Sequence, residues 1–463
     1  MKLCMIGTGY VGLVSGVCFS DIGNTVYCVD KDQKKIDLLN KGILPIFEPG
    51  LEEILKKNLK QKRLIFTSDL NKAVKNSDII FICVGTPSKK NTNSANLKNV
   101  FSVVKDLKKI IKKYKIIITK STVPVSTGDE IEKVLINLKK KKLVDIVSNP
   151  EFLREGEAIR DFVYPDRIII GTDSKKANKI LKSLYLPIIK KTNRYFNTSR
   201  RGAELIKYAS NAFLATKISF INELANLCEK ANVDIKDISL GMGSDERIGS
   251  RFLRAGPAYG GSCFPKDTRA LIDTGNKFKT DLSIVKTVVN SNDKRKTLLV
   301  KRVEKILKGN LSNKIITFLG VTFKPNTDDM REASSIPMIK YLNKKNSKIK
   351  YYDPSGEKDN FKNLKVSPSL SNSLRASGLV LPFAAITFSD LLYKRLTAEN
   401  LLLSSSKSIP VFSSSSPSAS SPACGPGRTS SSSSMNPTTK SEILLSSFLI
   451  NAYSNNISSI IPG

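Results

Sequence analysis

The sequence predicts an α/β fold with two doubly wound domains joined by a long central helix, the second of them incomplete. Three observations predict this fold. Short apolar runs recur through the first 150 residues, each followed by small polar residues, which is typical of buried parallel strands. A proline-free segment over residues 200–231 has apolar residues at helical spacing. After it, residues 314–353 repeat a strand, helix, strand pattern.

The chain begins with the pattern of a dinucleotide-binding turn. An apolar run at residues 2–6 predicts a strand, and residues 11–22 predict a helix that a glycine ends. Gly7, Gly9 and Gly12 have GxGxxG spacing at this junction. In such a Rossmann-like turn the first glycine makes the bend, the second admits a pyrophosphate, and the third lets helix and strand pack closely.

An acidic residue follows the next expected strand. Asp30 comes directly after residues 25–29 and lies 18 residues beyond Gly12. A carboxylate in this place binds the ribose hydroxyls of adenosine and repels a 2′-phosphate, which favours NAD over NADP. The pyrophosphate is then expected at the helix N-terminus, where free N–H groups and the helix dipole favour anions.

Three more expected strands, at residues 79–84, 115–119 and 145–147, end in small polar residues. Thr86 and Thr122 follow the first two of them. Ligands of open α/β sheets bind at the carboxyl ends of the strands, so both threonines are candidates for ligand contact. Ordinary loops with helix N-caps are the alternative interpretation.

Two carboxylates follow the third of these strands. Glu151 and Glu155 are four residues apart, which places them on one face if the segment is helical. Two acids that face one site can divide the work of a base and of a cofactor contact. An exposed, capped start of a helix is the alternative interpretation.

The expected central helix, residues 200–231, is long for a globular protein, so it either spans between domains or packs in a dimer. Lys207 and Asn211 lie four residues apart on one of its faces. A lysine and an amide one turn apart can stabilise a developing oxyanion. A solvated lysine beside an asparagine is the commoner arrangement.

A glycine- and arginine-rich stretch over residues 243–261 suits phosphate binding, because the guanidinium group is planar and makes several hydrogen bonds. It leads to Cys263, with Lys266 and Asp267 close behind. A cysteine attacks as thiolate, and Lys266 is a candidate for the nearby cation that lowers its pKa. Asp267 is a candidate to hold a proton or orient a water. A glycine turn that contains a small apolar residue is the alternative.

The composition excludes several kinds of site. The chain has no histidine and no pair of cysteines in CxxC spacing, so we expect no metal site and no Cys-His or Ser-His catalysis. Seven scattered cysteines indicate reduced thiols and a cytoplasmic protein. The net charge of +34 is spread over nearly every segment, which argues against a nucleic-acid partner and for anionic ligands. No stretch has the length needed to span a membrane.

The last third of the chain predicts a second nucleotide-type fold and then a break. Strands are expected at residues 314–319 and 348–353, with a helix at 334–342 between them. After about Leu370 serine dominates and charged residues become rare. We therefore expect a largely disordered tail over residues 371–463.

These blocks together resemble the UDP-glucose 6-dehydrogenase family. The resemblance covers residues 1 to about 355. The stretches that carry it are IGTGYVGLVSG, VGTP, KSTVPVSTG, SNPEFLREGEAI, AELIKYASNAFLATKISFINE, RIGSRFLRAGPAYGGSCFPKD and GVTFKPNTDDMREA. It implies a four-electron oxidation of UDP-glucose to UDP-glucuronate by two NAD⁺. Cys263 would be the nucleophile, forming a thiohemiacetal with the C6 aldehyde and then a thioester.

The resemblance also assigns the other site residues. It implies that Lys207 and Asn211 steady the oxyanion, that Asp267 assists water, and that Thr122 and Glu151 handle protons. The implied contacts to NAD come from Gly7, Gly9, Gly12, Asp30, Lys35, Thr86, Thr122, Glu155, Lys266 and Arg331. The implied contacts to the UDP-sugar come from Glu151, Phe152, Leu153, Arg154, Glu155, Lys207, Asn211, Phe252, Leu253, Arg254, Ala255, Gly256, Gly260 and Lys324. Arg247 would reach the neighbouring subunit's site in a homodimer built on the central helix.

The expected domains follow from the same comparison of motifs. They are an NAD-binding Rossmann-like domain at 1–196, a central helical domain at 197–300, and a partial UDP-binding Rossmann-like domain at 310–370. After about Leu370 the chain matches nothing of the family, and it has no tryptophan, so we expect an altered C-terminus or a frameshift. The alternatives are a related dehydrogenase of GDP-mannose or of a UDP-N-acetylhexosamine, and an inactive nucleotide-binding protein with a disrupted C-terminal domain.

Overall fold

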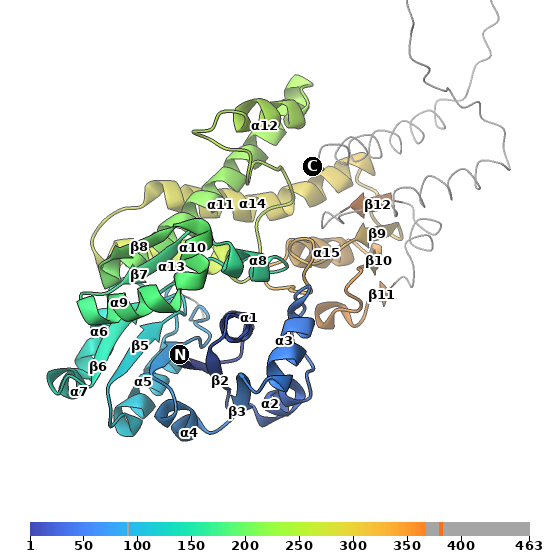
Figure 1. Ribbon diagram of the computed structural model, residues 1–463. Helices are drawn as coiled ribbons and strands as arrows, with labels where there is room; N and C mark the ends of the chain where they lie inside the picture. The colour runs from blue at the N-terminus through green and yellow to red at the C-terminus, as the bar shows by residue number, and fades with distance from the viewer. Residues whose placement is uncertain (90–91, 367–378, 383–463) are drawn as a thin grey trace, which may run out of the picture. The chain divides into compact units, whose positions relative to one another are not determined.

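The computed structural model describes residues 1–89, 92–366 and 379–382 (Figure 1). Eight strands in this part of the chain form one sheet in the order β3-β2-β1-β4-β5-β6-β7-β8. Neighbouring strands run parallel, except that β6 and β7 pair antiparallel. The strands are β1 (Lys2–Ile6), β2 (Thr25–Val29), β3 (Leu64–Thr67), β4 (Ile79–Ile82), β5 (Lys115–Thr119), β6 (Val144–Ser148), β7 (Ile168–Gly171) and β8 (Tyr195–Thr198).

Helices cover both faces of this sheet, so the doubly wound prediction for the first domain is confirmed. One apolar core lies under helices that include α1, α3, α8 and α9, and a second lies under α4, α5 and α6. The helices are α1 (Tyr10–Asp21), α2 (Gln33–Asn40), α3 (Leu51–Lys60), α4 (Leu70–Lys75), α5 (Lys98–Ile110), α6 (Thr127–Val134), α7 (Ile136–Lys140), α8 (Ala158–Val163), α9 (Lys175–Leu184) and α10 (Leu186–Thr192). Strand order reverses between β1 and β4, which creates a ligand crevice at the carboxyl ends of the strands.

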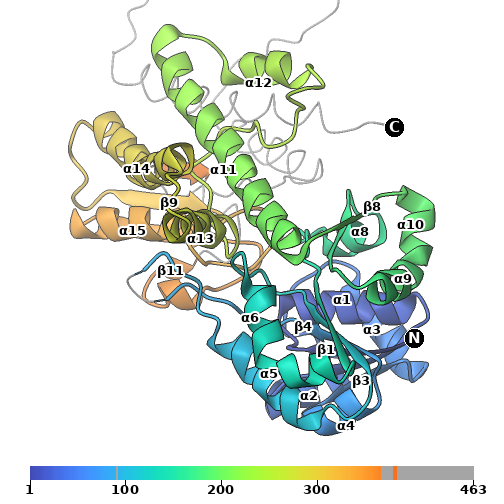
Figure 2. The same cartoon turned by 90° about the vertical axis from the view of Figure 1, so that its left-hand side faces the viewer.

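The central helix α11 runs from Arg200 to Ala231, as predicted (Figure 2). Ser199 caps its first turn by accepting a hydrogen bond from the Gly202 N–H at 3.0 Å, and Asn232 ends it in the left-handed conformation. Three further helices accompany it: α12 (Ile235–Gly243), α13 (Phe264–Lys277) and α14 (Ser283–Ile306). Buried side chains such as Tyr208 and Leu271 pack α11 against α13.

A second parallel sheet has the order β11-β10-β9-β12 in the described part of the chain. Its strands are β9 (Ile315–Leu319), β10 (Lys348–Tyr352), β11 (Lys365–Val366) and β12 (Leu379–Pro382). Helix α15 (Ser335–Lys344) connects β9 to β10 and packs on the apolar core of this sheet. The expected strand, helix, strand pattern is therefore present.

Strand β12 corrects the expected start of the tail. Residues 379–382 lie within the predicted disordered segment, yet they pair in parallel with β9. The short apolar run Leu-Val-Leu is typical of a parallel strand, and in the described residues it forms the end strand of this sheet. The rest of the expected tail, 383–463, lies outside the described residues.

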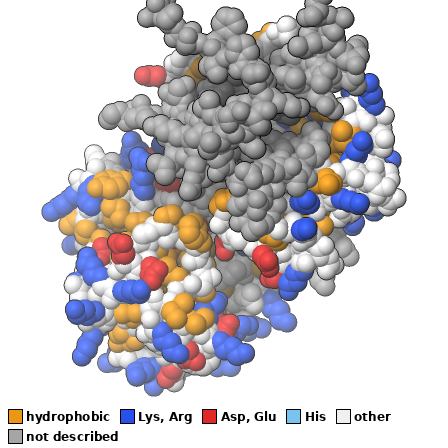
Figure 3. Space-filling model, turned by 90° about the vertical axis from the view of Figure 1, so that its right-hand side faces the viewer, with side chains coloured by type: hydrophobic (Ala, Val, Ile, Leu, Met, Phe, Trp, Pro, Cys, Tyr) orange, Lys and Arg blue, Asp and Glu red, His pale blue; other side chains and the backbone are white. Residues whose placement is uncertain are grey.

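Charged side chains do not gather in one stripe on the face shown in Figure 3, where Lys and Arg are scattered among apolar and acidic residues. This distribution agrees with the interpretation that the net positive charge is spread over nearly every segment of the chain. Among the described helices, none is both long enough and apolar enough to cross a membrane.

Candidate active site

The glycine-rich turn has the shape that a dinucleotide needs. Gly7 has a φ of 100°, and a Cβ there would lie 2.9 Å from the Cys83 carbonyl oxygen. A Cβ on Gly12 would lie only 1.9 Å from the Gly7 carbonyl oxygen, so helix and turn are in direct contact. Gly9 differs, because nothing lies within 4 Å of its Cβ position. Gly9 also precedes α1 without a side-chain cap, which leaves the helix N–H groups available to an anion.

Asp30 is held at the end of β2 as expected. Its carboxylate accepts hydrogen bonds from the Thr8 N–H at 2.9 Å and the Thr8 hydroxyl at 2.8 Å, and Lys35 Nζ lies 3.3 Å away. Burial alone would raise the pKa of Asp30, but these hydrogen bonds and Lys35 together lower it. The group is therefore an anion beside the turn, which is suited to a ribose diol.

Two substitutions in this turn should separate its structural role from its binding role. Gly12→Ala should destabilise the fold by about 1–3 kcal/mol or more, because its Cβ overlaps backbone. Gly9→Ala should leave the melting temperature nearly unchanged but weaken NAD⁺ binding at least about tenfold, because the Cβ enters the open space. Thermal melting and calorimetric titration with NAD⁺ measure the two effects. Equal loss of stability in both variants would contradict this division of roles.

A cavity of about 540 Å³ brings together most of the residues predicted for catalysis. Its walls come from the segment after β6, from α11, and from the segments around Cys263 and Phe323. The predicted residues that line it are Glu151, Phe152, Leu153, Arg154, Glu155, Lys207, Asn211, Phe252, Gly260, Cys263 and Lys324. Of the other predicted sugar contacts, Ala255 and Gly256 are partly exposed, Arg254 is exposed, and none of the three is in the lining.

The two glycines before Cys263 are required by close packing. A Cβ on Gly260 would lie 2.5 Å from the Glu332 carbonyl oxygen, and Gly261, with a φ of 80°, would meet the Phe323 ring at 2.6 Å. The Gly261 N–H donates to the Arg331 carbonyl oxygen at 2.8 Å. These contacts hold Cys263 directly before α13, half-buried at the cavity wall. The other described cysteines are buried.

The cation that acts on Cys263 is not the one expected from the sequence. Burial raises the pKa of the Cys263 thiol, and Lys207 opposes this effect. Lys266 instead binds the carboxylate of Asp267, its neighbour in the chain. The prediction that Lys266 lowers the pKa of the thiol was therefore wrong, because α13 turns the Lys266 amine toward Asp267.

Lys207 is buried and faces the cavity beside a carboxylate. Its Nζ lies 3.1 Å from Glu151 Oε1 and 5.1 Å from the centre of the Phe152 ring. Burial alone would lower the pKa of Lys207, but Glu151 and the nearby Cys263 and Asp267 raise it overall. The amine is therefore a fixed positive charge next to the thiol.

One turn further along α11, Asn211 holds the second carboxylate. Asn211 Nδ2 donates to Asp267 Oδ2 at 2.6 Å, and the Asp267 side chain is fully buried. The shared face of Lys207 and Asn211 is present, since both residues line the cavity. Each one thus positions an acid, Glu151 in one case and Asp267 in the other.

The segment with Glu151 and Glu155 is not helical, which corrects the sequence interpretation. Helix α8 begins only at Ala158, and Gly156 has a φ of 85° where a Cβ would lie 2.7 Å from the Asn326 carbonyl oxygen. Glu151 Oε2 accepts the Leu153 N–H at 2.6 Å, a local turn that competes with a helix. The two acids consequently have different neighbours.

Glu155 faces the C-terminal part of the site. Its Oε1 lies 3.4 Å from Arg331 Nη2, and its Oε2 accepts from the Thr327 hydroxyl at 3.3 Å. Burial raises the pKa of Glu155 in spite of the nearby Arg331 and Lys324. Lys324 Nζ donates to the Glu155 carbonyl oxygen at 2.6 Å. Residues 324–331 therefore close the site from the side of the second sheet.

Thr86 and Thr122 lie together at the carboxyl ends of β4 and β5. The Thr86 hydroxyl donates to the Thr122 carbonyl oxygen at 2.8 Å. Neither is the N-cap of the helix that follows, since α5 and α6 are preceded by Leu97 and Ser126. Both threonines therefore lie at the edge of the crevice that the reversal of strand order creates.

Arg247 lies away from the cavity in the single chain. Its side chain is 90% exposed and pairs with Asp245 at 2.6 Å.

The segment 252–256, which was predicted to contact the sugar, is held by the central helices. Leu253 is buried, and the Gly256 N–H donates to Asn222 Oδ1 at 2.8 Å.

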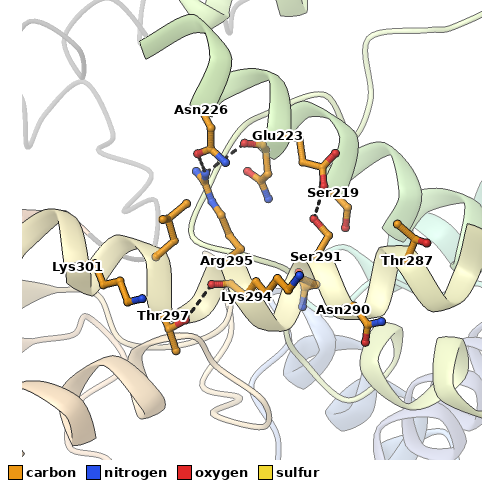
Figure 4. A pocket seen from close by; sticks show the side chains of 13 residues that line it. Ser219, Glu223, Asn226, Thr287, Asn290, Ser291, Lys294, Arg295, Thr297 and Lys301 are labelled. Atoms are coloured by element: carbon orange, nitrogen blue, oxygen red, sulfur yellow. Dashed lines mark hydrogen bonds between the residues drawn. The ribbon is translucent and has the colours of Figure 1, made fainter. Parts of the chain in front are cut away.

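A second cavity, of about 680 Å³, lies between α11 and α14, and no residue predicted from the sequence lines it (Figure 4). Arg295 donates to the Asn222 and Gly256 carbonyl oxygens at 3.1 and 3.0 Å and to Asn226 Oδ1 at 2.5 Å. Ser291 donates to Glu223 at 2.6 Å. Through the Gly256 carbonyl oxygen, Arg295 anchors residues 252–256, which were predicted to contact the sugar.

Sequence reasoning missed Lys120, which is buried and lines the first cavity. Its Nζ donates to Asn149 Oδ1 at 3.3 Å, and burial lowers the pKa of the amine to about 8. The only sequence signal for Lys120 is its place directly after β5, two residues before Thr122. Glu204, a buried acid in the second turn of α11, was also missed.

Comparison with known proteins gives matches along most of the chain. Residues 1–189 match the NAD binding domain of the UDP-glucose/GDP-mannose dehydrogenase family, 201–294 its central domain, and 317–400 its UDP binding domain. The third match extends past Leu370, which corrects the expectation that nothing of the family follows that residue.

Named relatives and solved structures agree with these matches. A UDP-glucose 6-dehydrogenase of Rhizobium meliloti is 49% identical over 358 residues, 77% of this chain and 82% of that protein. One of Pseudomonas aeruginosa is 41% identical over 399 residues, 85% of this chain and 86% of that protein. A UDP-glucose dehydrogenase structure from Pyrobaculum islandicum has a TM-score of 0.79 and 34% identity, covering 83% of this chain and 90% of that one. The UDP-N-acetyl-mannosamine dehydrogenase Cap5O of Staphylococcus aureus has a TM-score of 0.70 and 26% identity, covering 84% and 89%.

Proposed function

The chain belongs to the UDP-glucose/GDP-mannose dehydrogenase family, and from this premise we propose that it oxidises UDP-glucose to UDP-glucuronate with two NAD⁺. The observation that carries the proposal is the single cavity in which Cys263, Lys207 and Glu151 meet. UDP-glucose is favoured as substrate because relatives named for it are 41–49% identical, against 26% for the UDP-N-acetyl-mannosamine enzyme.

The residues around the glycine-rich turn fit an NAD cofactor. The open position beside Gly9 and the uncapped start of α1 would hold the pyrophosphate, and Asp30 would hold the adenosine ribose. Lys35, Thr86, Thr122, Glu155, Lys266 and Arg331 remain proposed contacts to the rest of the cofactor. When bound, NAD⁺ accepts a hydride from the sugar in each of the two oxidations.

In the first oxidation the C6 alcohol loses a hydride and a proton and becomes an aldehyde. We assign the proton to Glu151, acting through water with Thr122, because the chain contains no histidine. The Lys207 ammonium, 3.1 Å from Glu151, would stabilise negative charge on the C6 oxygen.

In the second oxidation the Cys263 thiolate adds to the aldehyde carbon, giving a thiohemiacetal whose oxygen faces Lys207. Loss of the remaining C6 hydride turns this adduct into a thioester. Water then attacks the thioester carbon, the C–S bond breaks, the carboxylate product is released, and the Cys263 thiol is regenerated. Asp267, held by Asn211 and Lys266, would take the proton of that water.

The test is oxidation of a panel of sugar nucleotides by the purified full-length chain. UDP-glucose should give NADH with a kcat/KM at least about a hundredfold above GDP-mannose and UDP-N-acetylmannosamine, because a site built to hydrogen-bond one substrate rejects analogues that leave its polar groups unpaired. A preference for either of the other two would replace the substrate while leaving the family chemistry in place. Binding of NAD⁺ without turnover of any of them would mark an inactive nucleotide-binding protein.

We also propose the domain limits 1–196 and 197–300, with a UDP-binding domain from 310 to at least Pro382. Matches to the family's three domains at 1–189, 201–294 and 317–400 support these limits. The free thiols of the six described cysteines support a reducing, cytoplasmic setting. Limited proteolysis should cut first in the loop at residues 307–314, between α14 and β9, if the second limit is right.

A homodimer through the central helix is proposed from exposed apolar side chains. Phe220 and Leu227 on α11 are 47% and 60% exposed, and Leu240 on α12 is 67% exposed. Such residues are typical of a surface that another subunit covers. Arg247, exposed beside them in the sequence, would then reach the partner's sugar. Light scattering should give twice the chain mass of 51.0 kDa, and a monomer at micromolar concentration would contradict the proposal.

A further inference from the structure

Glu204 lies in the second turn of α11, and its carboxylate is almost fully buried, with 3% of the residue exposed. The carboxylate accepts three hydrogen bonds. Its Oε2 accepts the Ser126 N–H at 2.8 Å, and its Oε1 accepts the Gly128 N–H at 2.8 Å and the Ser148 hydroxyl at 2.9 Å. Every donor belongs to the NAD-binding sheet domain, and the acceptor belongs to the central helix.

The first of these partners, helix α6, has no cap from its own sequence. Its N-cap residue, Ser126, has a φ of 79° and makes no side-chain cap hydrogen bond. Glu204 therefore supplies the missing acceptor from 76 residues away. Burial raises the pKa of this carboxyl to about 7, so above that pH its negative charge suits the positive end of the helix. Gly128 leaves room for it, because a Cβ there would lie 3.0 Å from Glu204 Oε1.

The three segments that meet at Glu204 all carry proposed site residues. The β5–α6 loop carries Thr122, and Ser148 lies three residues before Glu151. Glu204 itself lies one helical turn before Lys207. The ion pair between Lys207 and Glu151, at 3.1 Å, thus depends on how α11 is placed against the end of β6.

We propose that Glu204 is a positioning residue for the oxidation. By binding Ser126, Gly128 and Ser148 at once, it sets α11 against the sheet so that the Lys207 ammonium meets Glu151 and acts on Cys263. Glu204 does not line the cavity and touches no reacting atom. This inference rests on the proposed function for its kinetic consequence, but not for its structural one.

The test compares Glu204→Gln with Glu132→Gln. Glu132 on α6 also contacts α11, through Arg200 Nη1 at 2.8 Å, but it touches neither the start of α6 nor Ser148. Glu204→Gln replaces one carboxylate oxygen with an amide NH₂ that faces at least one of the backbone N–H donors, so kcat should fall about 10–100-fold while the KM for UDP-glucose changes less than about threefold. Glu132→Gln should keep kcat within about twofold.

A second readout does not depend on turnover. The rate of Cys263 alkylation by iodoacetamide, measured on its peptide by mass spectrometry, reports the thiolate that Lys207 favours. In Glu204→Gln this rate should fall severalfold at pH 8, and in Glu132→Gln it should not change. If the wild type oxidises no sugar nucleotide, the proposed function fails, and the alkylation rates still decide the role of Glu204.

Two results would overturn the inference. One is a kcat and an alkylation rate in Glu204→Gln equal to those of Glu132→Gln. The other applies if Glu204→Gln does not fold. Ser148→Ala then serves as the test, because it removes one of the three donors and should lower kcat about three- to tenfold. An unchanged kcat in Ser148→Ala would then count against the role, and the expected decrease would support it.

Discussion

Replacement of Cys263 by serine is expected to abolish steady-state oxidation of UDP-glucose, with a loss of at least about a thousandfold in kcat. Cys263 is the one described cysteine that is half-buried and in the cavity wall, so no other described thiol can take its place. Serine would occupy the same position, but its hydroxyl does not ionise in the pH range of the enzyme. The aldehyde would then form without the covalent adduct that the second hydride transfer requires.

NADH formation and product analysis by mass spectrometry measure this effect. Cys228→Ser is the matched control, because Cys228 is buried near the far end of α11 and does not line the cavity. Normal turnover is expected for the control, with at most a modest loss of stability. A Cys263→Ser enzyme that still makes UDP-glucuronate at a rate near the wild type would refute covalent catalysis here.

Replacement of Lys207 by methionine should lower kcat by about 10²–10³-fold, the loss typical of one oxyanion-stabilising group. The substitution also removes the cation that counteracts burial at Cys263, so the pKa of the thiol should rise further. Because a thiol reacts as its anion, the pH profile of Cys263 alkylation should move to higher pH. Alkylation rates measured across pH in the two proteins give this shift.

Two controls make the Lys207 result specific. Lys115→Met removes another buried lysine, whose amine binds the Ser77 carbonyl oxygen at the opposite end of β5 from the cavity, and should leave the alkylation profile unchanged. Lys207→Met also leaves Glu151 buried without its partner, a cost of about 3–5 kcal/mol. The double variant Lys207→Met/Glu151→Gln should regain stability but not activity. An unchanged alkylation profile in both Lys207 variants would contradict the assigned role.

The elements that local sequence determines were predicted well. The GxGxxG turn, the acid after β2 and both ends of α11 follow from glycine spacing, strand length and helical periodicity, and the structure agrees with each. The shared face of Lys207 and Asn211 follows from the same periodicity. Short apolar strands were also located to within about two residues, because parallel strands are buried on both faces.

Contacts between segments far apart in the sequence could not be predicted from local patterns. The i, i+4 spacing of Glu151 and Glu155 indicated a helix, but Gly156 bends the chain where it meets Asn326, some 170 residues further on. Lys266 was assigned to Cys263 by proximity in sequence, whereas the amine that acts on the thiol comes from α11. Glu204 had no local signal at all, since its three donors are more than 50 residues away.

The most direct test of the account is the number of NADH formed per UDP-glucose consumed by the wild-type chain with NAD⁺ in excess. Two NADH for each sugar, with UDP-glucuronate as the product and no free aldehyde, is the predicted result. It requires both oxidations at one site and a bound intermediate between them. One NADH for each sugar, with the C6 aldehyde released to solvent, would contradict the thioester route and the role given to Cys263.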